Sequence, residues 1–287
     1  MSSAPTLAVF TKNLLNPAYK LARLAADRAA VRLGVRVIHY VPEKPDDIEQ
    51  QIALIDEALG QRPDAFVFNP VHETAIDGAI RRVKAQGVPI VNFINRMRNP
   101  DDYACFVGAD DYDIGTRVSE RLFGELGGRG NVAVLEGTPG AATGAARVRA
   151  FLDNARRHAG IRIVGRRNGA FLEKQGREAM EALLRECPQI DGVLAANHDM
   201  AAGAITALEH AARRALIVSV NATPEAIGAI RSGKLLATAD FNAAKIAAVA
   251  AEAAVKLLRG ESLPHEILLP VEIVDAANWR QFENAMV

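Results

Sequence analysis

The stretch "TLAVFTKNLLNP" at residues 6–17 decides the fold class, because it passes from an apolar strand directly into the start of a helix. A second stretch, "GNVAVLEGTPG" at residues 130–140, begins the same pattern again. Between and after them, apolar runs alternate with segments of helical periodicity. Most runs are continuously apolar, which is typical of parallel strands covered by helices on both faces. The sequence therefore predicts an α/β fold with two doubly wound, Rossmann-like lobes.

The predicted elements follow one another along the whole chain. In the first helix, which ends before Gly34, the spacing predicts a buried stripe of Leu21, Leu24, Ala25 and Val31. Strands are predicted at 7–10, 35–40, 65–68, 90–94, 104–107, 131–135, 161–165, 192–195, 215–220 and 235–239, with a last strand in "EILLPVEIV" at 266–274. Further helices are predicted at 45–59, 74–86, 112–126, 144–159, 174–186, 199–212, 224–232 and 242–259.

The number of predicted strands argues for two lobes, since open sheets rarely hold more than about ten. The strand in "YACFVGADDYDIG" at 103–115 is expected to carry the chain across a hinge, and the strand at 235–239 to carry it back. We expect an N-terminal lobe of residues 1–108 plus 242–268 and a C-terminal lobe of residues 109–241 plus 269–287. A ligand cleft is expected between lobes joined by several strands.

Composition and motifs exclude several classes of function. The 287 residues contain 34 Lys+Arg and 34 Asp+Glu, so the net charge of zero argues against nucleic-acid binding. The six histidines show no metal spacing, and no phosphate-binding or nucleophile motif follows a strand, so neither a metal, a cofactor nor an enzyme is predicted. No membrane span or leader is visible, which predicts either a cytoplasmic protein or one whose leader is absent from this sequence.

Polar residues, above all asparagines, follow the predicted strands. In doubly wound sheets ligands bind beyond the carboxyl ends of the strands. An asparagine offers one acceptor and two donors, which suits a hydroxyl group. Asparagines also cap helices and shape turns, and this second interpretation stays open. The strand ends carry Asn13, Asn16, Asn69, Asn95, Asn197, Asn221 and Asn242, and Lys12 also follows the first strand.

The chain resembles the type I periplasmic sugar-binding proteins, the solute-binding components of ABC transporters that are similar to ribose-binding protein. The segments that carry this resemblance include "NLLNPAYK", "FNPVHETAI", "VPIVNFINR", "FVGADDYDIG", "DGVLAANHDMAAGA" and "SVNATPEAIGAIRSGKLLATAD", within residues 7–274. The resemblance implies a periplasmic protein that closes two lobes over a monosaccharide, polyol or small sugar acid and delivers it to a membrane permease. The alternative is the ligand-sensing domain of a LacI-type regulator or a receptor-coupled sensor.

The resemblance also implies the ligand-binding residues by position. In the N-terminal lobe they are Asn16, Tyr19, Asn69, Asn95 and Arg96, and in the C-terminal lobe Arg147, Phe171, Asn197, Asn221, Asp240 and Phe241. Asn95 and Asn221 stand where such proteins usually have aspartates, which makes the site more positive by about two charges. Because an uncompensated buried arginine is costly, one hypothesis is an anionic ligand such as a sugar acid. The alternative is a neutral ligand, with Asp110, Asp111, Glu136 or Asp240 pairing with the arginines.

Overall fold

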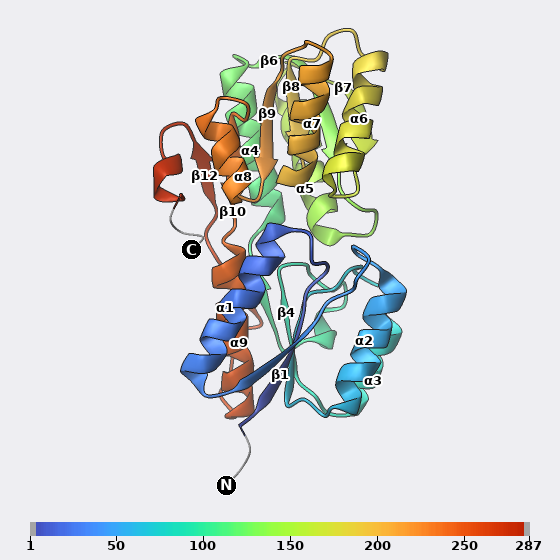
Figure 1. Cartoon of the computed structure of the whole chain (residues 1–287), viewed down its shortest axis with the longest axis vertical. Helices are drawn as coiled ribbons and strands as arrows, with labels where there is room; N and C mark the ends of the chain where they lie inside the picture. The colour runs from blue at the N-terminus through green and yellow to red at the C-terminus, as the bar shows by residue number, and fades with distance from the viewer. Residues whose placement is uncertain (1–3, 284–287) are drawn as a thin grey trace. The chain divides into compact units, whose positions relative to one another are not determined.

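The computed structural model describes residues 4–283 and divides the chain into two compact units (Figure 1). Unit 1 comprises Met1–Ala109, Gly140–Ala142 and Asn242–Leu269, and unit 2 comprises Asp110–Pro139, Thr143–Phe241 and Pro270–Val287. Residues 1–3 and 284–287, at the ends of the two predicted lobes, lie outside the described residues. The chain passes between the units after Ala109, after Phe241 and after Leu269, and the short segment Gly140–Ala142 also belongs to unit 1, so neither unit is one continuous segment.

Unit 1 contains a six-stranded, wholly parallel sheet in the order β11-β5-β4-β3-β1-β2. The strands are β1 (Thr6–Phe10), β2 (Arg36–Tyr40), β3 (Ala65–Phe68), β4 (Ile90–Phe93), β5 (Cys105–Gly108) and β11 (Glu266–Leu268). The helices are α1 (Pro17–Leu33), α2 (Ile48–Gly60), α3 (Asp77–Ala85) and α9 (Ala243–Leu258), with a short 3-10 helix η1 (Pro100–Asp102). Helices α1 and α9 lie side by side on one face, and α2 and α3 on the other (Figure 1).

The two faces of the unit 1 sheet are packed differently. The face under α2 and α3 is aromatic, with the Phe10 ring centroid 4.9 Å from that of Tyr40 and 5.0 Å from those of Phe66 and Phe68. Stacked aromatic pairs contribute about 0.5–1.5 kcal/mol beyond their buried area. This core fixes the strands β1, β2 and β3, and with them the loops that leave their carboxyl ends.

On the opposite face of the sheet, α1 and α9 pack mainly through alanines. The buried stripe that the sequence predicts for α1 is therefore wrong. The buried residues of α1 are Ala18, Ala22, Ala26, Ala29 and Ala30, whereas Leu24 is 44% exposed and Val31 85% exposed. Helix α9 buries a matching row of Ala243, Ala247, Ala250, Ala251 and Ala254. Two alanine faces let the helix axes approach closely, so small side chains take the buried face and the larger ones point to solvent.

Unit 2 repeats the doubly wound plan with the strand order β12-β10-β9-β8-β6-β7. Its strands are β6 (Arg129–Glu136), β7 (Gly160–Asn168), β8 (Gly192–Ala195), β9 (Leu216–Val220), β10 (Ala237–Asp240) and β12 (Glu272–Asp275). Its helices are α4 (Asp111–Glu125), α5 (Ala142–Arg157), α6 (Glu173–Glu186), α7 (His198–His210) and α8 (Pro224–Arg231), with a 3-10 helix η2 (Trp279–Gln281). The prediction of two doubly wound α/β lobes is therefore confirmed.

The last predicted strand, 266–274, is two strands that belong to different sheets. β11 pairs in parallel with β5 of unit 1, and β12 pairs antiparallel with β10 of unit 2. Pro270 lies between them and has no N–H with which to continue a strand ladder. The proline thus divides the apolar run, and the chain passes from one unit to the other at this point.

Two smaller findings complete the fold. The described cysteines, Cys105 and Cys187, are both free and buried. Among the described helices, none combines the length and the apolar character that crossing a bilayer requires.

Candidate ligand-binding site

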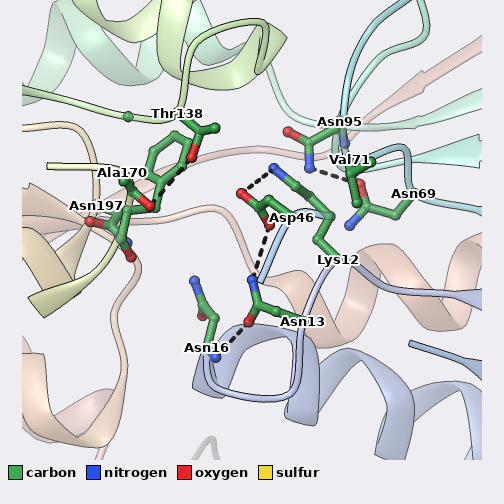
Figure 2. A network of polar contacts seen from close by, with 12 residues as sticks. Lys12, Asn13, Asn16, Asp46, Asn69, Val71, Asn95, Thr138, Ala170 and Asn197 are labelled. Atoms are coloured by element: carbon green, nitrogen blue, oxygen red, sulfur yellow. Dashed lines mark hydrogen bonds and ion pairs between the residues drawn. The ribbon is translucent and has the colours of Figure 1, made fainter. Parts of the chain in front are cut away.

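The carboxyl edge of the unit 1 sheet contains a buried ion pair that sequence reasoning did not single out. Lys12 follows β1 and is buried, with 2% of its side chain exposed. Its ammonium nitrogen lies 3.1 Å from Oδ2 of Asp46, in the loop after β2 (Figure 2). A buried lysine requires such a partner because an isolated charge is costly to remove from water.

Asp46 connects this ion pair to the start of α1. Asn13 donates from Nδ2 to Oδ1 of Asp46 at 3.2 Å, and the backbone N–H of Asn16 donates to Oδ1 of Asn13 at 2.9 Å (Figure 2). The Oδ1 of Asn16 accepts from the backbone N–H of Ala18 at 2.9 Å, so Asn16 is the N-cap of α1. Capping accounts for the oxygen of Asn16, and a contact from this residue to a ligand stays a prediction.

Tyr19, Asn69 and Asn95 form a second polar cluster of unit 1. Asn95 donates from Nδ2 to Oδ1 of Asn69 at 2.7 Å and to the hydroxyl oxygen of Tyr19 at 3.3 Å. Asn69 is buried, and its Nδ2 has no hydrogen-bond partner among the described residues. The structure therefore brings these three predicted residues together and leaves one buried donor unsatisfied.

Two further buried amides hold this cluster in place. Gln51 of α2 donates to the carbonyl oxygen of Asn69 at 3.0 Å and accepts from the backbone N–H of Val71 at 2.9 Å. Asn92 of β4 donates to the carbonyl oxygen of Asn95 at 2.8 Å and accepts from the backbone N–H of Met97 at 3.0 Å. These bonds fix the backbone after β3 and β4, where Asn69 and Asn95 project.

The phenol of Tyr19 stays protonated at neutral pH. Burial raises its pKa above the ordinary value of 10.0, Lys12 lowers it and Asp46 raises it. Since the Tyr19 oxygen accepts from Asn95, its own proton remains to be donated.

Arg96 lies against the aromatic core of unit 1. Its guanidinium carbon is 3.8 Å from the ring centroid of Phe106, and its side chain pairs with Glu266 of β11. A further contact joins it to the Tyr103 hydroxyl at 3.5 Å. The structure thus gives Arg96 an acidic partner, and its predicted contact with a ligand stays a prediction.

In unit 2, Arg147 of α5 forms a compact buried network. Its Nε donates to Oδ1 of Asp111 at 2.9 Å, and a terminal nitrogen lies 2.8 Å from the same oxygen. The other terminal nitrogen donates to the carbonyl oxygen of Ala196 at 2.9 Å. With 5% of the side chain exposed, this arginine is held by protein groups on both sides. Asp111 is one of the four acidic partners expected for a neutral ligand.

Phe171 is presented by a tight loop after β7. Ala170 and Phe171 both have left-handed backbone conformations, with φ values of 52° and 59°. Thr138 donates to the carbonyl oxygen of Ala170 at 3.3 Å (Figure 2), and Asn168 donates to that of Gly137 at 3.0 Å. The ring packs on Gly137, where an added Cβ would lie 2.0 Å from Cζ of Phe171. A glycine at 137 is therefore what lets this ring lie over the end of β6.

Asn197 and Asn221 end the strands β8 and β9. Asn197 caps α7 by accepting from the Met200 N–H at 3.0 Å, and donates to the Phe171 carbonyl oxygen at 3.0 Å and to Asp199 at 3.1 Å. Its amide thus holds the Phe171 loop. Asn221 has a left-handed φ of 84° and a buried Oδ1 without a partner among the described residues. A ligand contact from Asn197 stays a prediction, and Asn221 keeps a free acceptor.

The last two predicted residues lie at the end of β10. Phe241 is buried, and the Arg147 guanidinium carbon is 5.5 Å from its ring centroid. Asp240 is the half-buried final residue of β10 and stands opposite Glu272 of β12. Arg147 and Phe241 therefore meet within unit 2.

Sequence reasoning missed the ion pair Lys12–Asp46 and the supporting amides Gln51 and Asn92. The sequence did place Lys12 at the ligand-binding edge after the first strand, but it gave no sign of the partner of this lysine. Asp46 could not be recognised from the sequence, because it is adjacent to Asp47 and both aspartates suit the start of a helix. Asp47 is the N-cap of α2 and accepts from the Gln50 N–H at 2.9 Å. Across the part of the chain that the structure describes, no group of three or more His, Cys, Asp or Glu is placed to hold a metal.

Two α/β units connected by repeated chain crossings, each with polar side chains at the carboxyl edge of its sheet, define the class of two-domain binding proteins. The chain belongs to the periplasmic binding protein family, because the model described as "Periplasmic binding protein domain" matches residues 7–262. It is 28% identical to the ribose import binding protein of Bacillus subtilis, over 93% of this chain and 86% of that protein. It is 30% identical to the D-ribose/D-allose-binding protein of Pseudomonas aeruginosa, over 80% of this chain and 75% of that protein.

Solved structures agree with this assignment. The chain is similar to a periplasmic solute-binding protein of an ABC transporter from Actinobacillus succinogenes, which was crystallised with bound D-allose. The TM-score is 0.91 at 28% identity, covering 96% of this chain and 99% of that chain. The resemblance to type I periplasmic sugar-binding proteins is therefore confirmed.

Proposed function

We propose that this protein is the periplasmic solute-binding component of an ABC importer, and that it binds an uncharged monosaccharide or polyol for delivery to a membrane permease. In this proposal the two units close over one ligand, and binding needs no chemical step. Support comes from the family and from the relatives named for ribose and allose.

One observation carries the proposal: each unit has a buried amide atom without a partner among the described residues, directly after a strand. In unit 1 it is the donor Nδ2 of Asn69, and in unit 2 the acceptor Oδ1 of Asn221. An unsatisfied buried polar atom costs about 1–3 kcal/mol, so a ligand that satisfies it gains a comparable amount. Hydroxyl groups both donate and accept, so a polyol suits both atoms.

The pairing of the basic side chains favours the neutral alternative over the sugar acid. Arg96 pairs with Glu266, Arg147 with Asp111 and Lys12 with Asp46. The motive for an anionic ligand was an uncompensated arginine, and each of these cations has a carboxylate of its own. A carboxylate ligand would have to compete with these internal partners, whereas hydroxyl groups add hydrogen bonds without displacing them.

A ligand panel tests the proposal by thermal shift and calorimetric titration. We expect D-ribose, D-allose or xylitol to stabilise the protein, by about 2.7 kcal/mol at a hundredfold excess over Kd. A panel in which only sugar acids such as D-ribonate bind would contradict the neutral ligand. A panel in which no sugar or polyol binds would contradict the function itself.

A pair of asparagine variants then locates the site. Asn69→Ala is expected to lower apo stability by about 1–3 kcal/mol, because Oδ1 of Asn69 accepts from the side chain and the backbone N–H of Asn95. It should in addition weaken binding of the panel's tightest sugar by about tenfold or more, because the unpartnered donor Nδ2 is lost. The control Asn92→Ala removes an amide whose donor and acceptor are both used inside unit 1, so apo stability falls as well. Equal losses of sugar affinity in the two variants would contradict a ligand-facing Asn69.

A further inference from the structure

We propose that Asp46 is a specificity-determining residue, which neutralises the buried ammonium of Lys12 and thereby makes the site select uncharged sugars over sugar acids. This inference rests on the proposed function and names a residue that sets the charge of its ligand. The residues predicted from sequence to contact ligand do not include Asp46.

Both carboxylate oxygens and the backbone N–H of Asp46 contact residues that follow β1. Oδ2 pairs with Lys12 at 3.1 Å, and Oδ1 accepts from Asn13 at 3.2 Å. Its backbone N–H donates to the Lys12 carbonyl oxygen at 3.2 Å, so main chain and side chain both attach to the same residue. The carboxylate has 9% of its surface exposed and the lysine 2%, so water screens this pair weakly.

The backbone at Asp46 is in the left-handed region, with a φ of 58°. This region costs most residues about 1–2 kcal/mol, and aspartate tolerates it better than most other residues. Glycine would adopt this conformation without strain, and it would carry no carboxylate. The position therefore accepts backbone strain together with a charge, and Lys12 is the cation that this charge meets.

The pair lies within electrostatic reach of the cluster expected to face the ligand. Lys12 and Asp46 act on the hydroxyl of Tyr19 with opposite sign, one lowering and the other raising its pKa. That hydroxyl is hydrogen-bonded to Asn95, which donates to Asn69. A ligand bound at Asn69 and Tyr19 therefore experiences the sum of the two opposite charges of this ion pair, which is close to zero.

Removing the carboxylate leaves a buried positive charge beside the ligand. A cation a few ångströms from a ligand carboxylate in a partly buried site changes relative affinity by about tenfold or more. Asp46→Asn keeps the shape of the side chain, and Asp46→Gly also relieves the left-handed backbone. Lys12→Met acts in the opposite direction, because it leaves the carboxylate and removes the cation.

The experiment measures, for each variant, the ratio of Kd values within matched ligand pairs. The pairs are D-allose with D-alluronate, D-ribose with D-ribonate, and xylitol with D-xylonate, all titrated by calorimetry in the same buffer. We expect the wild type to prefer the neutral member of the pair that it binds. In Asp46→Asn and Asp46→Gly the ratio should move toward the acid by about tenfold or more.

Two controls separate charge selection from damage to the fold. Asp47→Asn removes the same charge from the neighbouring N-cap of α2, and its ratio should equal that of the wild type. Lys12→Met combined with Asp46→Asn should restore preference for the neutral ligand. If Asp46→Asn and Asp46→Gly bind but keep the wild-type ratio, or if Asp47→Asn shifts it equally, the inference is wrong. If the wild type binds none of the neutral ligands, the proposed function itself fails.

Discussion

At the scale of single residues, the contacts of Arg147 predict how much stability the protein loses when this side chain is removed. It is buried and bonded to Asp111 and to the carbonyl oxygen of Ala196, so its removal leaves the half-buried carboxylate of Asp111 without its cation. We expect Arg147→Ala to lower the free energy of unfolding by about 3–5 kcal/mol. The control Arg149→Ala, on the exposed side of the same helix, should cost about 1 kcal/mol or less. Denaturant unfolding of both variants measures this, and similar midpoints would contradict it.

The neighbours His198 and Asp199 make opposite contributions to stability as pH changes. Burial, together with smaller contributions from Glu173 and Glu225, raises the pKa of Asp199 to about 7. The folded state therefore holds this proton more tightly, and stability falls as pH rises from about 4 to about 7. Burial lowers the pKa of His198 to about 4, so its contribution rises with pH from about 4 to about 6.5.

These two effects nearly cancel in the wild type, and Asp199→Asn should separate them. With only the His198 contribution left, the variant should gain about 2 kcal/mol of stability between about pH 5 and about pH 8, while the wild type changes little. Urea unfolding at the two pH values measures the difference. A variant whose stability follows the wild type at both would show that Asp199 ionises normally.

The sequence predicted which polar residues lie at the strand ends, but it did not predict which side chains they contact. The rule that ligands bind at the carboxyl edge selects Asn69, Asn95 and Asn221 from the sequence alone. Arg96, in contrast, pairs with Glu266, which is 170 positions away and belongs to a strand that the sequence did not separate. Which side chains stay free for a ligand depends on such distant pairs, so sequence reasoning left the ligand charge open.

At the scale of elements, the Phe171 ring in the loop after β7 packs directly on Gly137, which follows β6. Gly137→Ala would place a Cβ 2.0 Å from Phe171 and force the ring away. We expect a loss of about 1–3 kcal/mol in stability and weaker binding of the tightest sugar. Gly124→Ala is the matched control, because no atom lies within 4 Å of the Cβ it would add in α4. Calorimetry and unfolding curves of both test this, and an unaffected Gly137→Ala would show that Phe171 moves freely.

The positions of the strands were predicted well from the sequence, whereas the buried face of a helix and the pairing of the last strands depend on packing and were predicted poorly. Continuous apolar runs placed the strands, because parallel strands buried on both faces tolerate few polar residues. The buried face of α1 was wrong, because leucine and valine outrank alanine in hydrophobicity while the α1–α9 contact requires small side chains. Pro270 was a visible break in the last apolar run, but which sheet each half joins depends on strand pairing.

At the scale of the whole molecule, binding of the proposed ligand should protect backbone amides in both units. We expect saturating sugar to slow amide hydrogen exchange after β3 and β4 of unit 1, at 69–71 and 94–97, and after β6 and β7 of unit 2, at 137–139 and 168–172. Residues 160–163, at the start of β7, serve as the control and should not change. Protection confined to one unit would contradict a single ligand held by both.

The division of residues 266–275 between two sheets has a consequence during protein synthesis. Both β11 and β12 are edge strands, and they are the last strands of their sheets to leave the ribosome. Until they emerge, β5 and β10 each present a bare row of peptide groups to any other chain nearby. The edge of β5 therefore stays open while residues 109–265 are synthesised, and the edge of β10 while residues 241–271 are synthesised, until one ten-residue segment pairs with both.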